Sequence, residues 1–134
     1  MTGPILGVIA DDFTGATDIA SMLTLGGMRV VQSIGPPSES FGMPDADALV
    51  IALKTRSVPA VDAVSQSLKA LEALCYAGVS QVQFKYCSTF DSTPDGNIGQ
   101  VSDALAKAME CDLVAHIPAL PVNGRTVYKG HLFV

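Results

Sequence analysis

The stretch ILGVIADDFTGATDIASMLTLGG, residues 5–27, decides the fold class of this chain. Its first six residues, Ile5 to Ala10, are apolar on both faces of an extended strand, which is typical of a central strand in a parallel sheet. Two aspartates follow at once, and apolar residues then recur at helical spacing until Gly26 and Gly27 end the pattern. A buried strand followed directly by a helix predicts the first half of a βαβ unit.

The same alternation of strand and helix continues along the chain. Further strands are predicted at residues 28–34, 48–53, 81–87 and 113–117, with helices beginning at Pro59 and after residue 97. Segments rich in Pro, Ser and Gly, such as residues 35–47, predict loops. We therefore expect residues 1–134 to form one α/β domain, with a three-layer, Rossmann-like fold and a mostly parallel sheet of about five strands.

Composition excludes several classes of protein. Of the 134 residues, 49% are apolar and only 16% are charged, so the chain can form a core and is not a disordered tail. The net charge of −5 argues against nucleic acid as a partner. No apolar run reaches the roughly 18 residues of a membrane span. The first residues lack the basic region of a signal peptide, so we expect a cytoplasmic location and no membrane partner.

The cysteines and histidines do not predict a metal site. Cys75, Cys87 and Cys111 have no CxxC or zinc spacing, and we expect reduced, partly buried thiols. His116 and His131 lack ligand spacing as well. Neither of the usual phosphate-binding patterns, GxxxxGK[ST] and GxGxxG, is present, so the residues predict no nucleotide site of those kinds.

Polar residues gather just after the predicted strands. The carboxyl ends of parallel strands meet at one edge of a sheet, where open α/β sheets bind ligands. The residues that follow the strands are Asp11, Asp12, Lys54, Arg56, Ser88, Asp91, Ser92, Asn123 and Arg125. Four loops therefore bring acids, bases and hydroxyls toward one place, which predicts a small-molecule site.

The types of side chain indicate what that molecule is. Arg56, Lys85 and Arg125 could hold an anion, the arginines through a planar fork and the lysine as a point charge. Hydroxyl groups could be bound by the polar side chains of Asp11, Asp12, Asp91, Ser92 and Asn97. An anion with several hydroxyls describes a small sugar acid. A carboxylate beside a bound hydroxyl could also act as a general base in phosphoryl transfer.

Simpler interpretations stay open for several of these residues. Asp11 and Asp12 could only favour the start of the following helix, with Thr14 as its capping residue. Asp18, within that helix, could be a solvated side chain. Lys85 could be a lysine of an edge strand whose amine reaches solvent.

Four segments resemble, in order, the motifs of the four-carbon acid sugar kinase family. They are ADDFTGATD at residues 10–18, TRS at 55–57, KYCSTFDSTPDGNIG at 85–99 and PALPVNGRTVYKG at 118–130. The third segment and the ending GHLFV are most similar to the branch of the family that acts on 3-oxo-tetronate.

The resemblance implies a two-domain enzyme that uses ATP, with Mg²⁺, to phosphorylate the terminal hydroxyl of a four-carbon sugar acid. In this family an N-terminal domain binds the sugar acid and a C-terminal domain supplies the nucleotide site. This chain would then be the N-terminal domain, without cofactor or metal residues of its own and inactive alone. Its apolar C-terminus suggests a possible homo-oligomer. The alternative is a stand-alone sugar-acid-binding or regulatory module without kinase activity.

The family motifs also imply roles for single residues. Arg56 and Lys85 are expected to bind the substrate carboxylate. Asp12 is the candidate catalytic residue for the reacting hydroxyl, with Asp91 as the second candidate. The substrate-binding positions implied by the motifs are Asp11, Asp12, Arg56, Lys85, Ser88, Asp91, Ser92 and Asn97.

Overall fold

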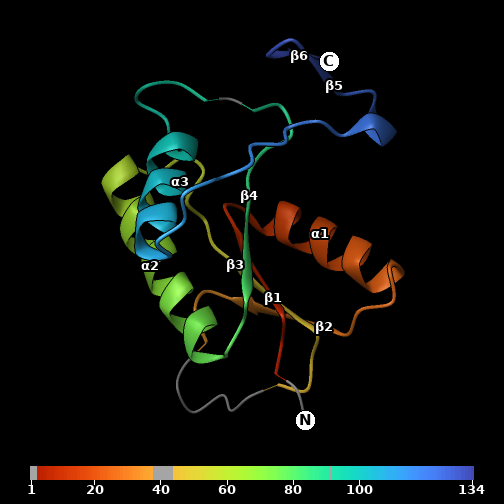
Figure 1. Cartoon of the computed structure of the whole chain (residues 1–134), viewed down its shortest axis with the longest axis vertical. Coiled ribbons are helices and arrows are strands. Elements are labelled where there is room, and N and C mark those ends of the chain that lie inside the picture. Colours follow the sequence, from red (N-terminus) through yellow and green to blue (C-terminus); the bar gives the residue numbers. More distant parts are fainter. Residues whose placement is uncertain (1–2, 38–43, 91) are drawn as a thin grey trace.

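The structure, a computed structural model, describes residues 3–37, 44–90 and 92–134, and it is a three-layer α/β domain with a small hairpin beside it (Figure 1). Its elements in order are β1 (Leu6–Ala10), α1 (Phe13–Leu25), β2 (Val30–Ile34), β3 (Ala48–Ala52), α2 (Ala60–Tyr76), β4 (Gln81–Lys85), α3 (Asn97–Ala108), a short 3-10 helix η2 (Pro121–Asn123), β5 (Thr126–Tyr128) and β6 (His131–Phe133).

Four strands pair in parallel in the order β2-β3-β1-β4. The predicted α/β class with a mostly parallel sheet is therefore confirmed. Strands β1 and β3 are central, and their residues are almost all buried, as their uniformly apolar sequences predict. Strand β4 is an edge strand, so exposed and half-buried residues alternate along it.

The two faces of the sheet carry different helices. Helix α1 covers one face, and α2 and α3 pack side by side on the other (Figure 1). On the α1 face the core consists of Val8, Ala10, Ala16, Ile19, Val50 and Ala52. On the other face, buried residues of β1 and β3 pack against Leu71, Leu74, Val101 and Leu105.

Helix α2 approaches the sheet closely at Gly7. A Cβ atom at this position would be 2.8 Å from Cδ1 of Leu74, which is completely buried. Only glycine leaves room for this leucine, whose burial stabilises the fold by roughly 2 kcal/mol. The glycine within the first predicted strand thus sets the distance between α2 and β1.

The strand predicted at residues 113–117 is wrong. The segment belongs to no sheet, and Leu113 and Ile117 are 88% and 72% exposed. It is held beside the residue that follows β4: the backbone N–H of Ile117 donates to the phenol oxygen of Tyr86 at 3.1 Å. Among the described residues, no helix packs over these apolar side chains. Pairing the segment with the sheet would therefore not bury them, and no buried strand forms.

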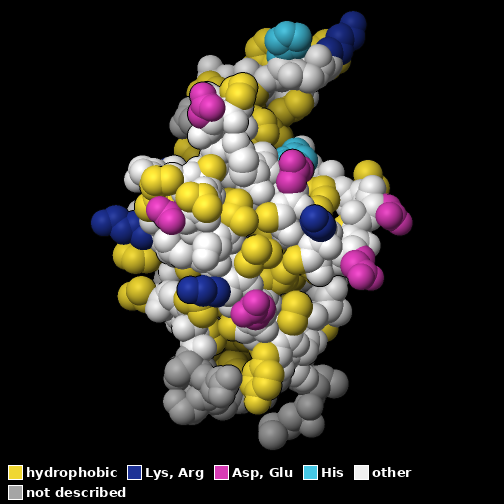
Figure 2. Space-filling view, turned by 90° about the vertical axis from the view of Figure 1, so that its left-hand side faces the viewer, with side chains coloured by type: hydrophobic (Ala, Val, Ile, Leu, Met, Phe, Trp, Pro, Cys, Tyr) yellow, Lys and Arg dark blue, Asp and Glu magenta, His cyan; other side chains and the backbone are white. Residues whose placement is uncertain are grey.

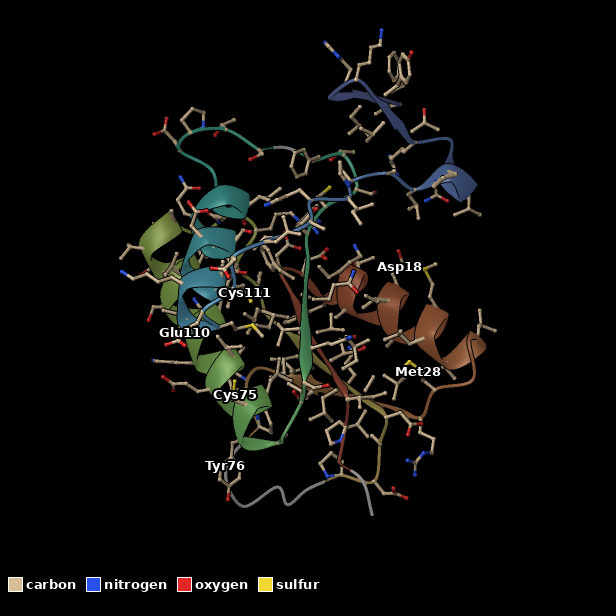
Figure 3. The ribbon with its side chains drawn as sticks, viewed as in Figure 1. Asp18, Met28, Cys75, Tyr76, Glu110 and Cys111 are labelled. Carbon is tan, nitrogen blue, oxygen red and sulfur yellow. The ribbon has the colours of Figure 1, made fainter. Side chains whose placement is uncertain are left out.

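The expectation of partly buried thiols also needs correction. The thiols are free, as predicted, but Cys75 and Cys111 are exposed and only Cys87 is partly buried (Figure 3). On α2, Val61 is exposed as Cys75 is, at 74%. The buried residues of this helix are Ala63, Ser67, Ala70, Leu71 and Leu74.

The C-terminal residues form an antiparallel hairpin of β5 and β6. Lys129 and Gly130 both have positive φ, 48° and 79°, which suits the tight two-residue turn between the strands. The hairpin projects from the body of the domain, and its residues are almost all exposed (Figure 2). Within the described ranges, no helix is long and apolar enough to cross a membrane.

Candidate functional site

The register of the sheet places three chain segments at one edge. Ala10, the last residue of β1, pairs with Ala52 of β3 on one side and with Lys85 of β4 on the other. The residues that follow these strands therefore leave the sheet together. The backbone holds them there, since the N–H groups of Thr55 and Arg56 donate to the carbonyl of Asp11 at 2.9 and 3.2 Å.

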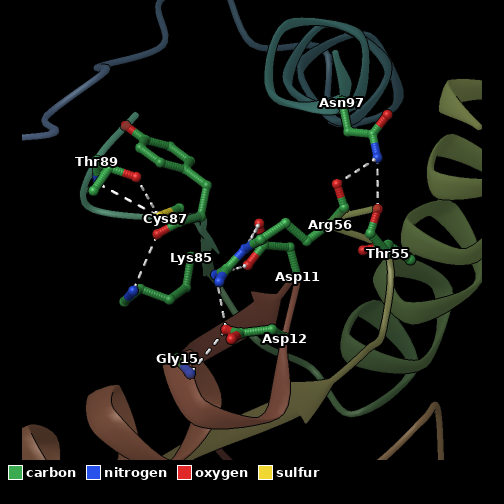
Figure 4. A network of polar contacts seen from close by, with 10 residues as sticks. Asp11, Asp12, Gly15, Thr55, Arg56, Lys85, Cys87, Thr89 and Asn97 are labelled. Atoms are coloured by element: carbon green, nitrogen blue, oxygen red, sulfur yellow. Dashed lines mark hydrogen bonds and ion pairs between the residues drawn. The ribbon is translucent and has the colours of Figure 1, made fainter. Parts of the chain in front are cut away.

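Arg56 forms a two-pronged ion pair with Asp11. Its Nε donates to Oδ2 at 3.1 Å and its Nη2 donates to Oδ1 at 2.7 Å. The Asp11 side chain is only 6% exposed, so its charge is compensated almost entirely by this arginine. The pair joins the end of β1 to the loop after β3 (Figure 4).

Asp12 has a structural contact and an open oxygen. Its Oδ1 accepts the N–H of Gly15 at 2.8 Å, which caps α1, and also accepts Nη2 of Arg56 at 2.8 Å. The capping interpretation is therefore confirmed for Asp12, and Thr14 is not the capping residue. Oδ2 of Asp12 has no hydrogen-bond partner among the residues that the structure describes, and the side chain is 26% exposed.

Arg56 stays charged in this arrangement. The hydrogen bond to Asp11 raises the pKa of its guanidinium above the ordinary value, although partial burial opposes the shift. One guanidinium and two carboxylates leave Asp11, Asp12 and Arg56 with a net charge of −1. This cluster is therefore suited to hydroxyl groups rather than to a second anion.

Asn97 fixes the loop that carries Arg56. Its Nδ2 donates to the carbonyl oxygens of Thr55 at 2.5 Å and Arg56 at 3.3 Å (Figure 4), and also to that of Val58 at 3.0 Å. These bonds join the start of α3 to the loop after β3. The amide nitrogen of Asn97 is therefore engaged with the backbone of this loop. Thr55, whose carbonyl it binds, is buried, which the sequence analysis did not predict.

Lys85 ends β4 on the other side of the cluster. Its Nζ donates to the carbonyl of Tyr86 at 3.0 Å and lies beside the first turn of α1, 3.4 Å from the Cβ that a side chain at Gly15 would have. It forms no ion pair with any described residue. The amine is half-buried at the site, so it is more than a solvent-directed lysine of an edge strand.

Ser88 is joined to a segment distant in sequence. Its Oγ accepts a hydrogen bond from Nη1 of Arg125 at 2.8 Å. Arg125 follows η2 and Gly124, which has a φ of 71°, and its backbone pairs with Leu120 in a tight turn. The fourth predicted loop therefore reaches the loop after β4, although the strand expected before it does not form among the described residues.

Aromatic rings border the loop after β4. Tyr86 lies 5.3 Å from Phe90 and is stacked on His116 at 6.4 Å between ring centroids. Burial raises the pKa of Tyr86 above 10.0, partly opposed by the hydrogen bond from Ile117. Phe90 has a φ of 51°, which is uncommon for a bulky residue and marks local strain in this loop.

The remaining predicted residues have mixed outcomes. Asp91 lies outside the described residues. Ser92 is exposed in the same loop, and Asp18 is exposed on α1 (Figure 3). Throughout residues 3–37, 44–90 and 92–134, no group of three or more His, Cys, Asp or Glu side chains is placed to hold a metal ion. The structure thus brings together Asp11, Asp12 and Arg56, with Lys85 beside Asp12 and Asn97 bonded to the loop of Arg56. Ser88 lies in the loop after β4 and pairs with Arg125.

The fold and the polar cluster define a parallel α/β domain with a candidate small-ligand site at the carboxyl edge of its sheet. Residues 6–134 match the family described as the sugar-binding N-terminal domain. The chain belongs to this family.

Individual relatives carry kinase names. The chain is 61% identical over 132 residues to a 3-oxo-tetronate kinase of Pseudomonas savastanoi pv. phaseolicola, covering 98% of this chain and 31% of the relative. It is 61% identical over 130 residues to a 3-oxo-tetronate kinase of Escherichia coli, covering 96% and 33%. The chain therefore spans about a third of the length of these curated relatives.

Solved structures agree with the fold. A protein of Salmonella typhimurium described as a putative tRNA synthase has a TM-score of 0.94 and 57% identity, covering 99% of this chain and 32% of that one. A domain of unknown function from Bordetella bronchiseptica, solved with bound citrate as a domain-swapped dimer, has a TM-score of 0.84 and 32% identity, covering 98% and 33%.

Proposed function

We propose that this chain is the domain that binds the sugar acid in a kinase that phosphorylates the terminal hydroxyl of a four-carbon acid such as 3-oxo-tetronate. The observation that carries the proposal is the Asp12 carboxylate. Its Oδ1 is held by Gly15 and Arg56, while its Oδ2 has no partner among the described residues. A fixed carboxylate with one open oxygen is suited to a substrate hydroxyl.

Asp12 is the proposed general base. As the hydroxyl oxygen bonds to the γ-phosphorus of ATP, the hydroxyl proton would pass to Oδ2 of Asp12, and the bond from this phosphorus to the bridging oxygen would break to release ADP. Arg56 holds the carboxylate in place during this transfer, and Asn97 holds the loop of Arg56. Asp91, a motif residue, stays the second candidate for the base. Ser88 and Ser92 supply hydroxyls in the adjoining loop.

ATP, with Mg²⁺, is the proposed phosphoryl donor, bound by residues outside this chain. Two observations support this placement: the sequence has no phosphate-binding glycine pattern, and the two carboxylates at the site are already paired with Arg56. The described residues therefore do not fit a nucleotide-bound metal ion, and this chain alone is expected to bind the acid without turnover.

Two further proposals, one on assembly and one on location, accompany this function. The hairpin of β5 and β6 stands away from the sheet, and an isolated hairpin is marginal in water, which supports self-association through this segment. The domain-swapped dimer of the Bordetella bronchiseptica protein agrees with it. The three free cysteines support a reducing, cytoplasmic location.

Binding to the chain itself tests the proposal. Thermal unfolding should shift upward with four-carbon sugar acids, threonate and erythronate among them, and not with acetate at the same concentration. Asp12→Asn should retain most acid binding because the amide keeps the shape and an acceptor oxygen. If no four-carbon acid stabilises the chain, the sugar-acid function is wrong. If the chain with ATP and Mg²⁺ phosphorylates the acid, the placement of the donor site is wrong.

A further inference from the structure

We infer that Arg125, oriented by Ser88, binds the carboxylate of the sugar acid, and that Arg56 does not. This inference rests on the proposed function and chooses Arg125 over Arg56 among the three cations that the sequence offers for an anion. It concerns the loop after β4, where Arg125 donates to Ser88. It therefore fixes the direction in which the acid lies.

The first argument is the charge of the Arg56 cluster. Arg56 uses Nε and Nη2 on Asp11 and Asp12, and the three side chains together carry −1. A carboxylate placed there would face two carboxylates at short range, which raises its free energy. This pairing disfavours binding of the substrate anion at Arg56, the position that the family resemblance implied.

The second argument is the unused capacity of Arg125. Its Nη1 donates to Ser88, but its Nε is buried and has no hydrogen-bond partner within the described part of the chain. No described carboxylate lies within ion-pair distance of its guanidinium. A buried charged donor without an acceptor is costly, so such a group marks a place where an acceptor belongs.

The third argument is the position of the Arg125 backbone. The residues around it, from 121 to 131, are otherwise exposed, whereas Arg125 is half-buried. The turn at Gly124 and the paired backbone of Leu120 and Arg125 hold it rigidly. Arg125 is the one half-buried residue of this exposed segment, and it contacts Ser88 in the loop after β4. This placement suits a residue that binds a ligand better than one that only keeps the surface polar.

The site is then polarised along the length of the acid. Arg125 provides the positive end, and Asp11, Asp12 and Arg56, with Lys85 beside Asp12, provide the end that binds hydroxyls. A four-carbon acid bound between them has its carboxylate at Arg125 and its terminal hydroxyl toward Oδ2 of Asp12. Guanidinium donors also bind phosphate, so the experiment must separate the two anions.

The test compares threonate with its uncharged amide, threonamide, and with inorganic phosphate, by calorimetry on the chain. Wild type should bind threonate better than threonamide. Arg125→Gln should weaken threonate binding roughly ten- to hundredfold, the range expected for charged hydrogen bonds, and leave threonamide unchanged. Arg125→Lys should recover part of the loss, and Ser88→Ala should cause a smaller one. Lys129→Gln, in the exposed hairpin, is the matched control.

Circular dichroism and thermal unfolding would establish that each variant is folded. Unchanged threonate binding in Arg125→Gln would overturn the inference, as would a loss of phosphate binding alone. If Arg56→Gln abolishes the preference for threonate over threonamide and Arg125→Gln does not, Arg56 is the residue that binds the carboxylate. Failure of wild type to bind threonate or any other four-carbon acid would instead remove the proposed function, and this inference with it.

Discussion

Arg56 and Asp11 are 45 residues apart in the sequence, yet they form a two-pronged ion pair, with Nη2–Oδ1 at 2.7 Å and Nε–Oδ2 at 3.1 Å. The two residues meet because β1 and β3 are adjacent parallel strands that end at the same level of the sheet. The pair ties the two central strands together at the edge where the site lies. It is thus both a structural contact and the support for Asp12.

Removing this pair should destabilise the fold. Arg56→Gln leaves the carboxylate of Asp11, 6% exposed, without its cation. Breaking a buried pair costs about 3–5 kcal/mol, and the 40% exposure of Arg56 reduces the expected loss to about 2 kcal/mol. Urea unfolding at neutral pH measures it. Arg29→Gln is the control, since it breaks a similar fork to the exposed Asp47 and should change stability little.

A second variant separates charge from packing. Asp11→Asn in the Arg56→Gln background removes the unpaired buried charge, so the double variant should be more stable than Arg56→Gln alone. Equal losses from Arg56→Gln and Arg29→Gln would contradict the importance of burial at Asp11.

The sequence predicted the sheet well because the pattern of apolar residues within each strand is enough to identify it. The uniformly apolar runs at Val8–Ala10 and in β3 specify central parallel strands, and Gly26–Gly27 ends α1. The segment 113–117 is equally apolar, but apolarity alone does not show whether another layer covers it. The missing information is tertiary: Leu113 has no partner element, so its strand does not form.

The site was predictable as a set of residues but not as a set of contacts. Positions after the strands indicated Asp11, Asp12 and Arg56, because parallel strands end at one edge. Sequence could not show that Arg56 would be saturated by the two aspartates, since this depends on the register of β1 against β3. The pairing of Ser88 with Arg125 depends likewise on how residues 118–125 return to β4.

The carboxylate of Asp47 should titrate unusually low. Hydrogen bonds from the Arg29 side chain and backbone lower its pKa from 3.8 to about 2. Because the folded-state pKa is below the unfolded one, the small stabilisation from this solvent-screened pair is fully present above pH 3.8 and is lost as the pH falls toward 2. Carboxyl NMR titration should show the low midpoint, and Arg29→Gln should raise it. A midpoint near 3.8 in wild type would contradict the contact.

Asn97 should act as a positioning residue. Asn97→Ala removes the three donations to the loop at residues 55–58, so Arg56 should lose its fixed position and stability should fall by about 1–2 kcal/mol. Binding of threonate should weaken while its preference over threonamide remains, since the carboxylate contact is elsewhere. Gln100→Ala, which removes a single donation to Pro94, is the control in the same helix. A loss confined to Gln100→Ala would refute the role of Asn97.

Gly15 and Gly99 occupy the same position, third in their helices, and form a matched pair. A Cβ at Gly15 would be 2.6 Å from Oδ1 of Asp12, whereas a Cβ at Gly99 meets nothing within 4 Å. Gly99→Ala should therefore stabilise the chain by about 0.5–1 kcal/mol through helix propensity. Gly15→Ala should lose this gain and about 1 kcal/mol more, because the Asp12 carboxylate must leave its capping position.

The same displacement should reach the site. In Gly15→Ala the carboxylate of Asp12 moves away from Nη2 of Arg56, so threonate binding should weaken, while Gly99→Ala should bind as wild type does. Urea unfolding and calorimetry on the two variants check both effects. Equal stabilisation by the two alanines, with unchanged binding, would mean that Asp12 does not need its Gly15 contact to keep its place, and the rigid-carboxylate basis of the proposed reaction would then fail.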